Sequence, residues 1–147
     1  MSRVSLLLTA ICVLAGSVTA TSVPRVSLQE LTTTSGMIVH GRVESQSCGW
    51  DPEHRFIWTH TRIRIQDVVK GGPFTTVTVS EPGGTADGLI MEVPGAVRFT
   101  SGEEIVLFLR DTPLHYWRVR GWTQGKFHFG SPAEFTAFKS RVRRLLR

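Results

Sequence analysis

Apolar and polar residues alternate along much of the chain, which is the pattern of strands in a sheet with one buried face. The longest alternation runs from Phe56 to Val69. One of its faces carries Ile57, Thr59, Thr61, Ile63 and Ile65, and the other carries Trp58, His60, Arg62 and Arg64. We expect the first face to be buried and the second to meet solvent, as in an antiparallel sheet that is open on one side.

Shorter strands are predicted on both sides of this one. They cover residues 37–43, 75–80, 89–93, 105–109, 116–122 and 124–129. The continuous apolar run at 105–109 predicts the most buried strand of the set. Residues 45–55 are polar and turn-like, so we expect a loop there between the first two strands.

The stretch from Pro82 to Ile90 has the glycine spacing of a phosphate-binding loop. Such a loop also needs Lys, followed by Ser or Thr, after its second glycine. Leu89 and Ile90 stand at those positions, which argues against nucleotide binding. The pair Asp87-Gly88 instead predicts a tight hairpin turn between two strands.

Two capping signals predict a helix near each end of the chain. Ser27 and Glu30 have the spacing of a capping box, and a short helix should follow to about residue 33. Ser131 and Glu134 repeat that spacing around Pro132, which predicts an amphipathic helix over residues 132–146 with a basic outer face.

The order helix, six or seven strands, helix contains no βαβ alternation, so a nucleotide-binding parallel sheet is not expected. We predict a single, mainly β domain over residues 21–147. A small antiparallel β-barrel of the OB-like kind fits the pattern best, and a two-sheet β-sandwich is the alternative.

The first twenty residues have the features of an export signal. Arg3 precedes an apolar run over residues 4–14, and small residues lead up to Ala20. The run is shorter than the ~20 residues of a membrane-spanning helix, so we expect cleavage of the signal peptide 1–20 and a secreted or periplasmic chain. Cys48 is then the one cysteine that remains, either free or paired with another chain.

The formal net charge of +5 comes from the end of the chain. The last nine residues hold five basic and no acidic side chains, and the preceding part is close to neutral. Because a nucleic-acid-binding domain usually has a basic stripe across its folded face, the charge does not favour nucleic acid as a partner. The basic helix could touch anionic lipid, but packing of its apolar stripe on the sheet is the preferred interpretation.

No set of residues has the spacing of a catalytic or metal site. Cys48 has His54 and His60 nearby in sequence, but no helix begins after it to activate the thiol. Asp51 and Glu53 lie close to the same histidines, yet the pairs that aim two ligands at one ion are missing. We therefore expect no catalytic residues, no metal and no cofactor; a Cys/His-dependent enzyme or enzyme accessory is the alternative.

The candidate binding surface is a line of aromatic and basic side chains. It comprises Trp58, His60, Arg62 and Arg64, with Trp50 and Cys48 in the adjoining loop. Either Trp117 or the pair Arg118 and Arg120, on a neighbouring strand, could lie beside it. Such a composition is typical of protein-binding hot spots and also of surfaces that stack bases or sugars. We expect a non-enzymatic binding domain with a protein partner at the cell envelope or outside. Oligosaccharide or nucleic-acid binding on the same face is the alternative.

Several segments carry a resemblance to known proteins. They are IVHGRV, a Trp-Asp-Pro turn, FIWTHTRIRIQDVVKGG, VTVSEPGG, VPGAVRFTSGEEIVLFL and YWRVRGWTQGKF. Together they resemble a group of uncharacterised exported bacterial proteins over about Ser27 to Phe129, a group that implies no established activity. More distantly they are similar to netrin-like and metalloproteinase-inhibitor domains, which implies a five-stranded OB-type barrel. The inhibitory mechanism is not implied, because the chain expected to begin near Thr21 lacks the disulfide-tied N-terminal cysteine of those inhibitors.

Overall fold

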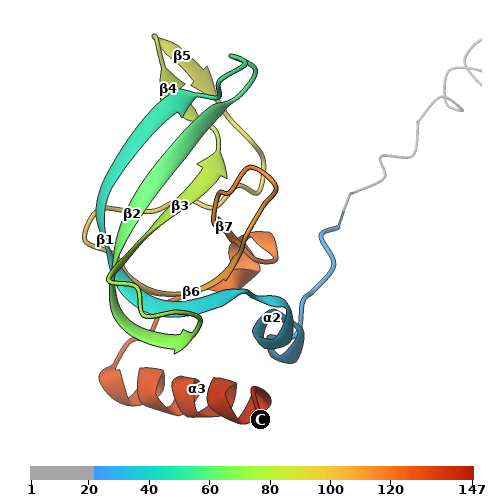
Figure 1. Ribbon diagram of the computed structural model, residues 1–147, viewed down its shortest axis with the longest axis vertical. Coiled ribbons are helices and arrows are strands. Elements are labelled where there is room, and N and C mark those ends of the chain that lie inside the picture. Colours follow the sequence, from blue (N-terminus) through green and yellow to red (C-terminus); the bar gives the residue numbers. More distant parts are fainter. Residues whose placement is uncertain (1–21) are drawn as a thin grey trace, which may run out of the picture.

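The computed structural model describes residues 22–147, and the expected signal peptide 1–20 lies outside that range. The chain forms a mainly β domain with two α-helices and antiparallel sheets, as the sequence predicts (Figure 1). Within this range no helix combines the length and the apolar character needed to cross a membrane.

The larger sheet is built around two long strands, β1 and β2, which pair antiparallel along nearly their whole length. Its strands follow the order β3-β2-β1-β6-β7, with β8 also paired to β6. The bounds are β1 Met37–Trp50, β2 Ile57–Lys70, β3 Thr76–Pro82, β6 Glu104–Arg110, β7 Arg118–Val119 and β8 Lys126–Phe127.

The sheet curves until its outer strands approach each other. One isolated parallel bridge joins Val79 of β3 to Trp117, just before β7, and the Ser80 amide donates to the Trp117 carbonyl at 2.9 Å. No continuous ladder closes the gap between β3 and β7 in residues 22–147, so the expected closed barrel is not established.

A separate hairpin of β4 (Gly84–Ala86) and β5 (Leu89–Met91) follows β3. It lies at one end of the molecule, opposite the C-terminal helix (Figure 1). Asp87 and Gly88 form its turn with φ of 50° and 76°, the left-handed values that a two-residue hairpin loop of this kind requires. The predicted turn is thus confirmed.

Both predicted α-helices form at their capping residues. Helix α2 spans Leu28–Thr34 and α3 spans Pro132–Leu145, and in each the Ser before the helix accepts a hydrogen bond from the amide of the Glu three residues on. A serine that accepts from this amide satisfies one of the donors left free at a helix start, which explains why both helices begin where the sequence places them.

The prediction of a loop over residues 45–55 is wrong, because β1 continues to Trp50 and only the segment around 51–56 turns. The continuation pairs with β2 in an unbroken register from Ser45 opposite Arg62 to Trp50 opposite Ile57. A bulge beside Glu44 shifts that register. Side chains in this part are largely exposed, so backbone pairing stabilises it without an apolar pattern to predict it.

The predicted strand over 116–122 is also much shorter than expected. Only Arg118–Val119 pairs as β7, because Gly121 adopts a left-handed φ of 67° and the chain enters a 3-10 helix, η2, at Trp122–Gly125. The last strand, predicted over 124–129, is likewise reduced to Lys126–Phe127.

Hydrophobic side chains fill both sides of β6, the predicted most buried strand. One core cluster, on the concave side of the curved sheet, contains Ile105, Leu107 and Leu109. The other, on the convex side, contains Val106 and Phe108. The convex pair is covered by Leu31 of α2 and by Phe135, Phe138 and Val142 of α3. The amphipathic C-terminal helix therefore packs on the sheet, as preferred from its sequence.

Candidate functional site

The four side chains predicted to share the polar face of β2 divide into two groups. Arg62 and Arg64 are exposed, and both form ion pairs with Glu44 at the bulge of β1. The hydrogen bond from Arg64 is the largest cause of a lowered pKa for the Glu44 carboxyl, and the charges of both arginines add to it. These two arginines are therefore engaged with a neighbouring strand.

Trp58 and His60 form the second group, and both are half-buried. The ring of Tyr116, from the segment before β7, lies edge-on to both, with centroids 5.3 Å from Trp58 and 5.5 Å from His60. Tyr116 was not singled out by the sequence, since only the approach of β7 to β3 brings it here.

Arg118 extends this group along the edge of the sheet. Its guanidinium carbon lies 5.6 Å from the Trp58 ring centre and 5.8 Å from that of Trp122, within reach of a cation–π interaction with both. We call Trp58, His60, Tyr116, Arg118 and Trp122 the aromatic–arginine seam. These contacts bring Arg118 beside Trp58, although β7 pairs with β6 and not with β2 as the prediction of a neighbouring strand implied.

The buried carboxylate of Glu81 holds Arg118 of the seam in place. Glu81 of β3 is only 2% exposed. One of its oxygens accepts from the Val119 amide at 2.7 Å, and the other accepts from the Arg118 guanidinium at 3.0 Å. A buried charge with a cation and an amide as partners is held in one geometry. Glu81 thus joins β3 to β7 next to the bridge between Val79 and Trp117.

His60 is tied to the buried hydroxyl of Ser80, with Nδ1 and Oγ 2.7 Å apart. Burial lowers the pKa of His60, which keeps the ring neutral near pH ~7. Ser80 is only 2% exposed, so the pair lacks the open nucleophile of a hydrolase and is better suited to joining β2 and β3.

We expect the folded protein to lose stability as the pH falls through the range in which His60 titrates. The pKa of His60 is lower in the folded state than the ~6.5 of an unfolded histidine, so the unfolded chain takes up the proton more readily. The contribution of His60 is therefore fully present above pH ~6.5 and is lost as the pH drops toward the folded pKa. Thermal unfolding midpoints should decline with acid less steeply in His60→Gln than in wild type. If His115→Gln, at an exposed histidine, flattens the profile equally, His60 is not the responsible group.

Trp50 and Cys48 lie away from the seam. The Trp50 indole donates to Asp87 of the β4–β5 turn at 3.0 Å, and its ring stacks on His54 with centroids 5.9 Å apart. Trp50 thereby connects the β1–β2 turn to the neighbouring hairpin.

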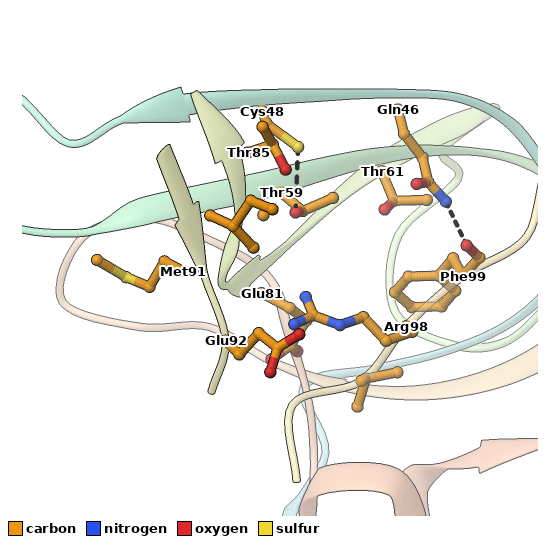
Figure 2. A pocket seen from close by; sticks show the side chains of 13 residues that line it. Gln46, Cys48, Thr59, Thr61, Glu81, Thr85, Met91, Glu92, Arg98 and Phe99 are labelled. Carbon is orange, nitrogen blue, oxygen red and sulfur yellow. Dashed lines mark hydrogen bonds between the residues drawn. The ribbon is translucent and has the colours of Figure 1, made fainter. Parts of the chain in front are cut away.

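Cys48 lines a cavity of about 290 Å³ between the long strands and the β4–β5 hairpin (Figure 2). Its sulfur lies 3.4 Å from the Thr59 hydroxyl. The register pairs Cys48 with Thr59, and His60 with Ser47, so the side chains of Cys48 and His60 project from opposite faces of the sheet. The structure does not bring this Cys–His pair together.

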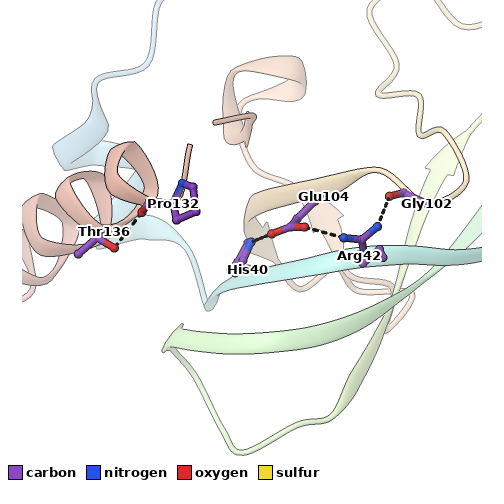
Figure 3. Close-up of polar contacts among 6 residues, drawn as sticks. All are labelled: His40, Arg42, Gly102, Glu104, Pro132 and Thr136. Carbon is purple, nitrogen blue, oxygen red and sulfur yellow. Dashed lines mark hydrogen bonds and ion pairs between the residues drawn. The ribbon is translucent and has the colours of Figure 1, made fainter. Parts of the chain in front are cut away.

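A second polar group lies where α3 meets the sheet (Figure 3). Glu104 accepts from Arg42 at 2.8 Å and lies 2.9 Å from the His40 ring nitrogen, and that ring packs on Phe135 with centroids 4.1 Å apart. Near the first turn of the helix, Thr136 donates to the Pro132 carbonyl at 2.9 Å. The contact between His40 and Phe135 places α3 against β1, and Glu104 joins β1 to β6 beside it.

Within residues 22–147, no three His, Cys, Asp or Glu side chains gather as they would to hold a metal ion. Compared with known proteins, the chain matches no family model and no curated protein. The resemblance to exported bacterial proteins therefore stays a prediction.

Proposed function

We propose that the chain is an exported, non-enzymatic binding domain that engages a protein partner across the aromatic–arginine seam. The observation that carries this proposal is the position of Arg118, which lies near two tryptophans and is fixed by the buried Glu81. Trp, Tyr and Arg dominate the energetics of protein interfaces, above all where they are held in place before the partner arrives.

The exposure of the seam suits this role. Trp122 is 43% exposed, and Trp58, Tyr116 and Arg118 are half-buried, so each retains surface for a partner. The ordering cost on binding is small because these side chains are already packed on one another.

We also propose that the fold is a partly open barrel of the OB type. Five strands in the order β3-β2-β1-β6-β7, with the bridge between Val79 and Trp117, support it. In such barrels the face of the second and third strands and the loop between the fourth and fifth form the ligand-binding surface. Trp58 and His60 lie on β2, and Tyr116 lies in the loop between β6 and β7, which is the equivalent place.

Affinity capture from the native extracytoplasmic fraction tests the proposal. A double variant, Trp122→Ala with Tyr116→Ala, should lose a partner protein that wild type retains. The matched control is Phe56→Ala with Phe74→Ala, two phenylalanines each 50% exposed outside the seam. Circular dichroism first establishes that all three proteins fold. Retention of the same partner by the seam variant would contradict the proposal.

The alternatives give different results in the same experiment. If the protein is a thiol-dependent enzyme or accessory, Cys48→Ser should abolish its activity. If it binds a partner through the seam, Cys48→Ser should capture that partner as wild type does. If the ligand is an oligosaccharide, free sugars should release the captured material. If it is a nucleic acid, a nuclease should release it, and the affinity should fall steeply as salt rises because phosphate contacts are lost.

A further inference from the structure

Three arginines share one face at the end of the sheet beside the seam. Arg110 of β6 stands directly opposite Arg118 of β7 in the ladder, and Arg120 follows two residues after Arg118. Residues two apart on an extended chain project to the same side, and the intervening Val119 is buried on the other. Like charges directly opposite each other destabilise a sheet, so this arrangement calls for a counter-charge.

The chain supplies only part of that counter-charge. Arg118 is paired with Glu81, whereas the side chains of Arg110 and Arg120 form no ion pair or hydrogen bond with any residue from 22 to 147. Burial, followed by the charges of Arg118 and Arg120, lowers the pKa of Arg110. The guanidinium groups of Arg110 and Arg120 thus lie near that of Arg118, and neither has an acidic partner among residues 22–147.

The three arginines line a cavity of about 300 Å³. Trp122 and two valines, Val23 and Val26, contribute apolar wall, and Glu30 contributes one carboxylate. Gln124 fixes one side, because its amide accepts from the Val26 amide at 2.8 Å and donates to the Pro24 carbonyl at 3.0 Å. The pocket therefore has a cationic wall formed by the arginines and an apolar wall formed by the valines and Trp122.

We propose that this pocket binds a carboxylate that carries an apolar group, presented by an acidic or C-terminal segment of the protein partner, with Arg110 and Arg120 as its ligands. The protein origin of the carboxylate rests on the proposed function, whereas the pocket itself does not. Guanidinium groups bind carboxylates through paired hydrogen bonds, and the valines and Trp122 receive the apolar group.

The balance of charge favours a carboxylate over a phosphate. The three arginines, together with Glu81 and Glu30, leave one positive charge among the described residues around the pocket. A carboxylate neutralises it, whereas a phosphate, with a charge of about −1.5 to −2, would leave an excess of negative charge in a partly buried site.

Small probes test the pocket without the partner. N-acetyl-phenylalanine should bind the purified protein saturably, with Kd on the order of 1 mM for a ligand of this size. N-acetyl-phenylalaninamide, which lacks the charge, and inorganic phosphate, which lacks the apolar group, should each bind at least about tenfold more weakly. Calorimetry gives the affinities, and the Nε–H resonances of the arginines in NMR spectra locate the ligand. Equal binding of the amide or of phosphate would overturn the proposal.

Single substitutions then separate a ligand-binding role from a structural one. Arg110→Gln and Arg120→Gln should each weaken binding of N-acetyl-phenylalanine about tenfold or more. The matched Arg64→Gln, at an exposed arginine of β2 outside the pocket, should not. Arg110→Gln should also unfold at the same or a higher temperature, because the repulsion across the ladder is removed. Unchanged binding in both pocket variants would overturn the proposal.

Failure of this inference can be told apart from failure of the proposed function. If the probe does not bind but capture still depends on Trp122 and Tyr116, the seam binds a partner that presents no carboxylate here, and the pocket proposal alone is overturned. If the probe binds as described and no partner protein is captured, the pocket stands and the protein origin of its ligand is wrong.

Discussion

Glu81→Ala is expected to lower the free energy of unfolding by about 3–5 kcal/mol, the cost of breaking a buried ion pair by removing one partner. Glu81 is 2% exposed and Arg118 is half-buried, so the variant leaves a partly buried guanidinium without its carboxylate. It also leaves the Val119 amide, which donates to Glu81 at 2.7 Å, without an acceptor. Denaturant unfolding monitored by circular dichroism measures the loss.

The matched control is Glu53→Ala. Glu53 also pairs with an arginine, Arg55, but both side chains are exposed. An exposed pair contributes less than about 1 kcal/mol, so this variant should unfold close to wild type. A similar small effect for both variants would mean that water reaches Glu81 and that the carboxylate does not fix Arg118. The seam would then lack the rigid support on which the proposed function depends.

Features set by local sequence were predicted well. The caps at Ser27 and Ser131 act within one turn, so the start of each helix follows from neighbouring residues alone. The faces of β2 follow from strict alternation, and Ile57 and Ile63 are buried as expected. The Asp87-Gly88 turn is equally local, because its positive φ values depend on those two residues.

Features set by long-range pairing were not predicted. The polar half of β1 is a strand only because β2 lies beside it, and the place of Tyr116 and Arg118 depends on the approach of β7 to β3. The sequence of β3 does contain one signal of this long-range pairing. Glu81 continues the alternation of Val77 and Val79, which places an acid on a buried face and therefore implies a cationic partner elsewhere in the chain.

The same limit applies to the predicted binding surface. Alternation correctly puts Trp58, His60, Arg62 and Arg64 on one face, but it says nothing about what lies next to each. The bulge at Glu44 places its carboxylate beside Arg62 and Arg64. The approach of β7 to β3 places Tyr116 beside Trp58 and His60. A bulge depends on the register of two strands, which alternation within one strand does not encode.

Phe108→Ala is expected to lower the free energy of unfolding by about 3–5 kcal/mol, the usual cost of emptying a large core site. The Phe108 side chain is fully buried. Its ring lies 5.4 Å from that of Phe127 and 6.2 Å from that of Phe138 on α3, centre to centre. Phe74→Ala, at a phenylalanine 50% exposed, should change stability by no more than about 0.5 kcal/mol.

A second measurement on Phe108→Ala distinguishes a packed helix from one that contacts membrane. Helix α3 carries Arg141, Arg143 and Arg144, where trypsin can cut only when that part of the helix unfolds locally. If packing on Phe108 holds α3 in place, the variant should be cut there sooner than Phe74→Ala under native conditions. If the helix is instead cut equally fast in wild type, its apolar face is free in solution. The basic helix would then be available to anionic lipid, and the core on the outer face of β6 would contribute little to stability.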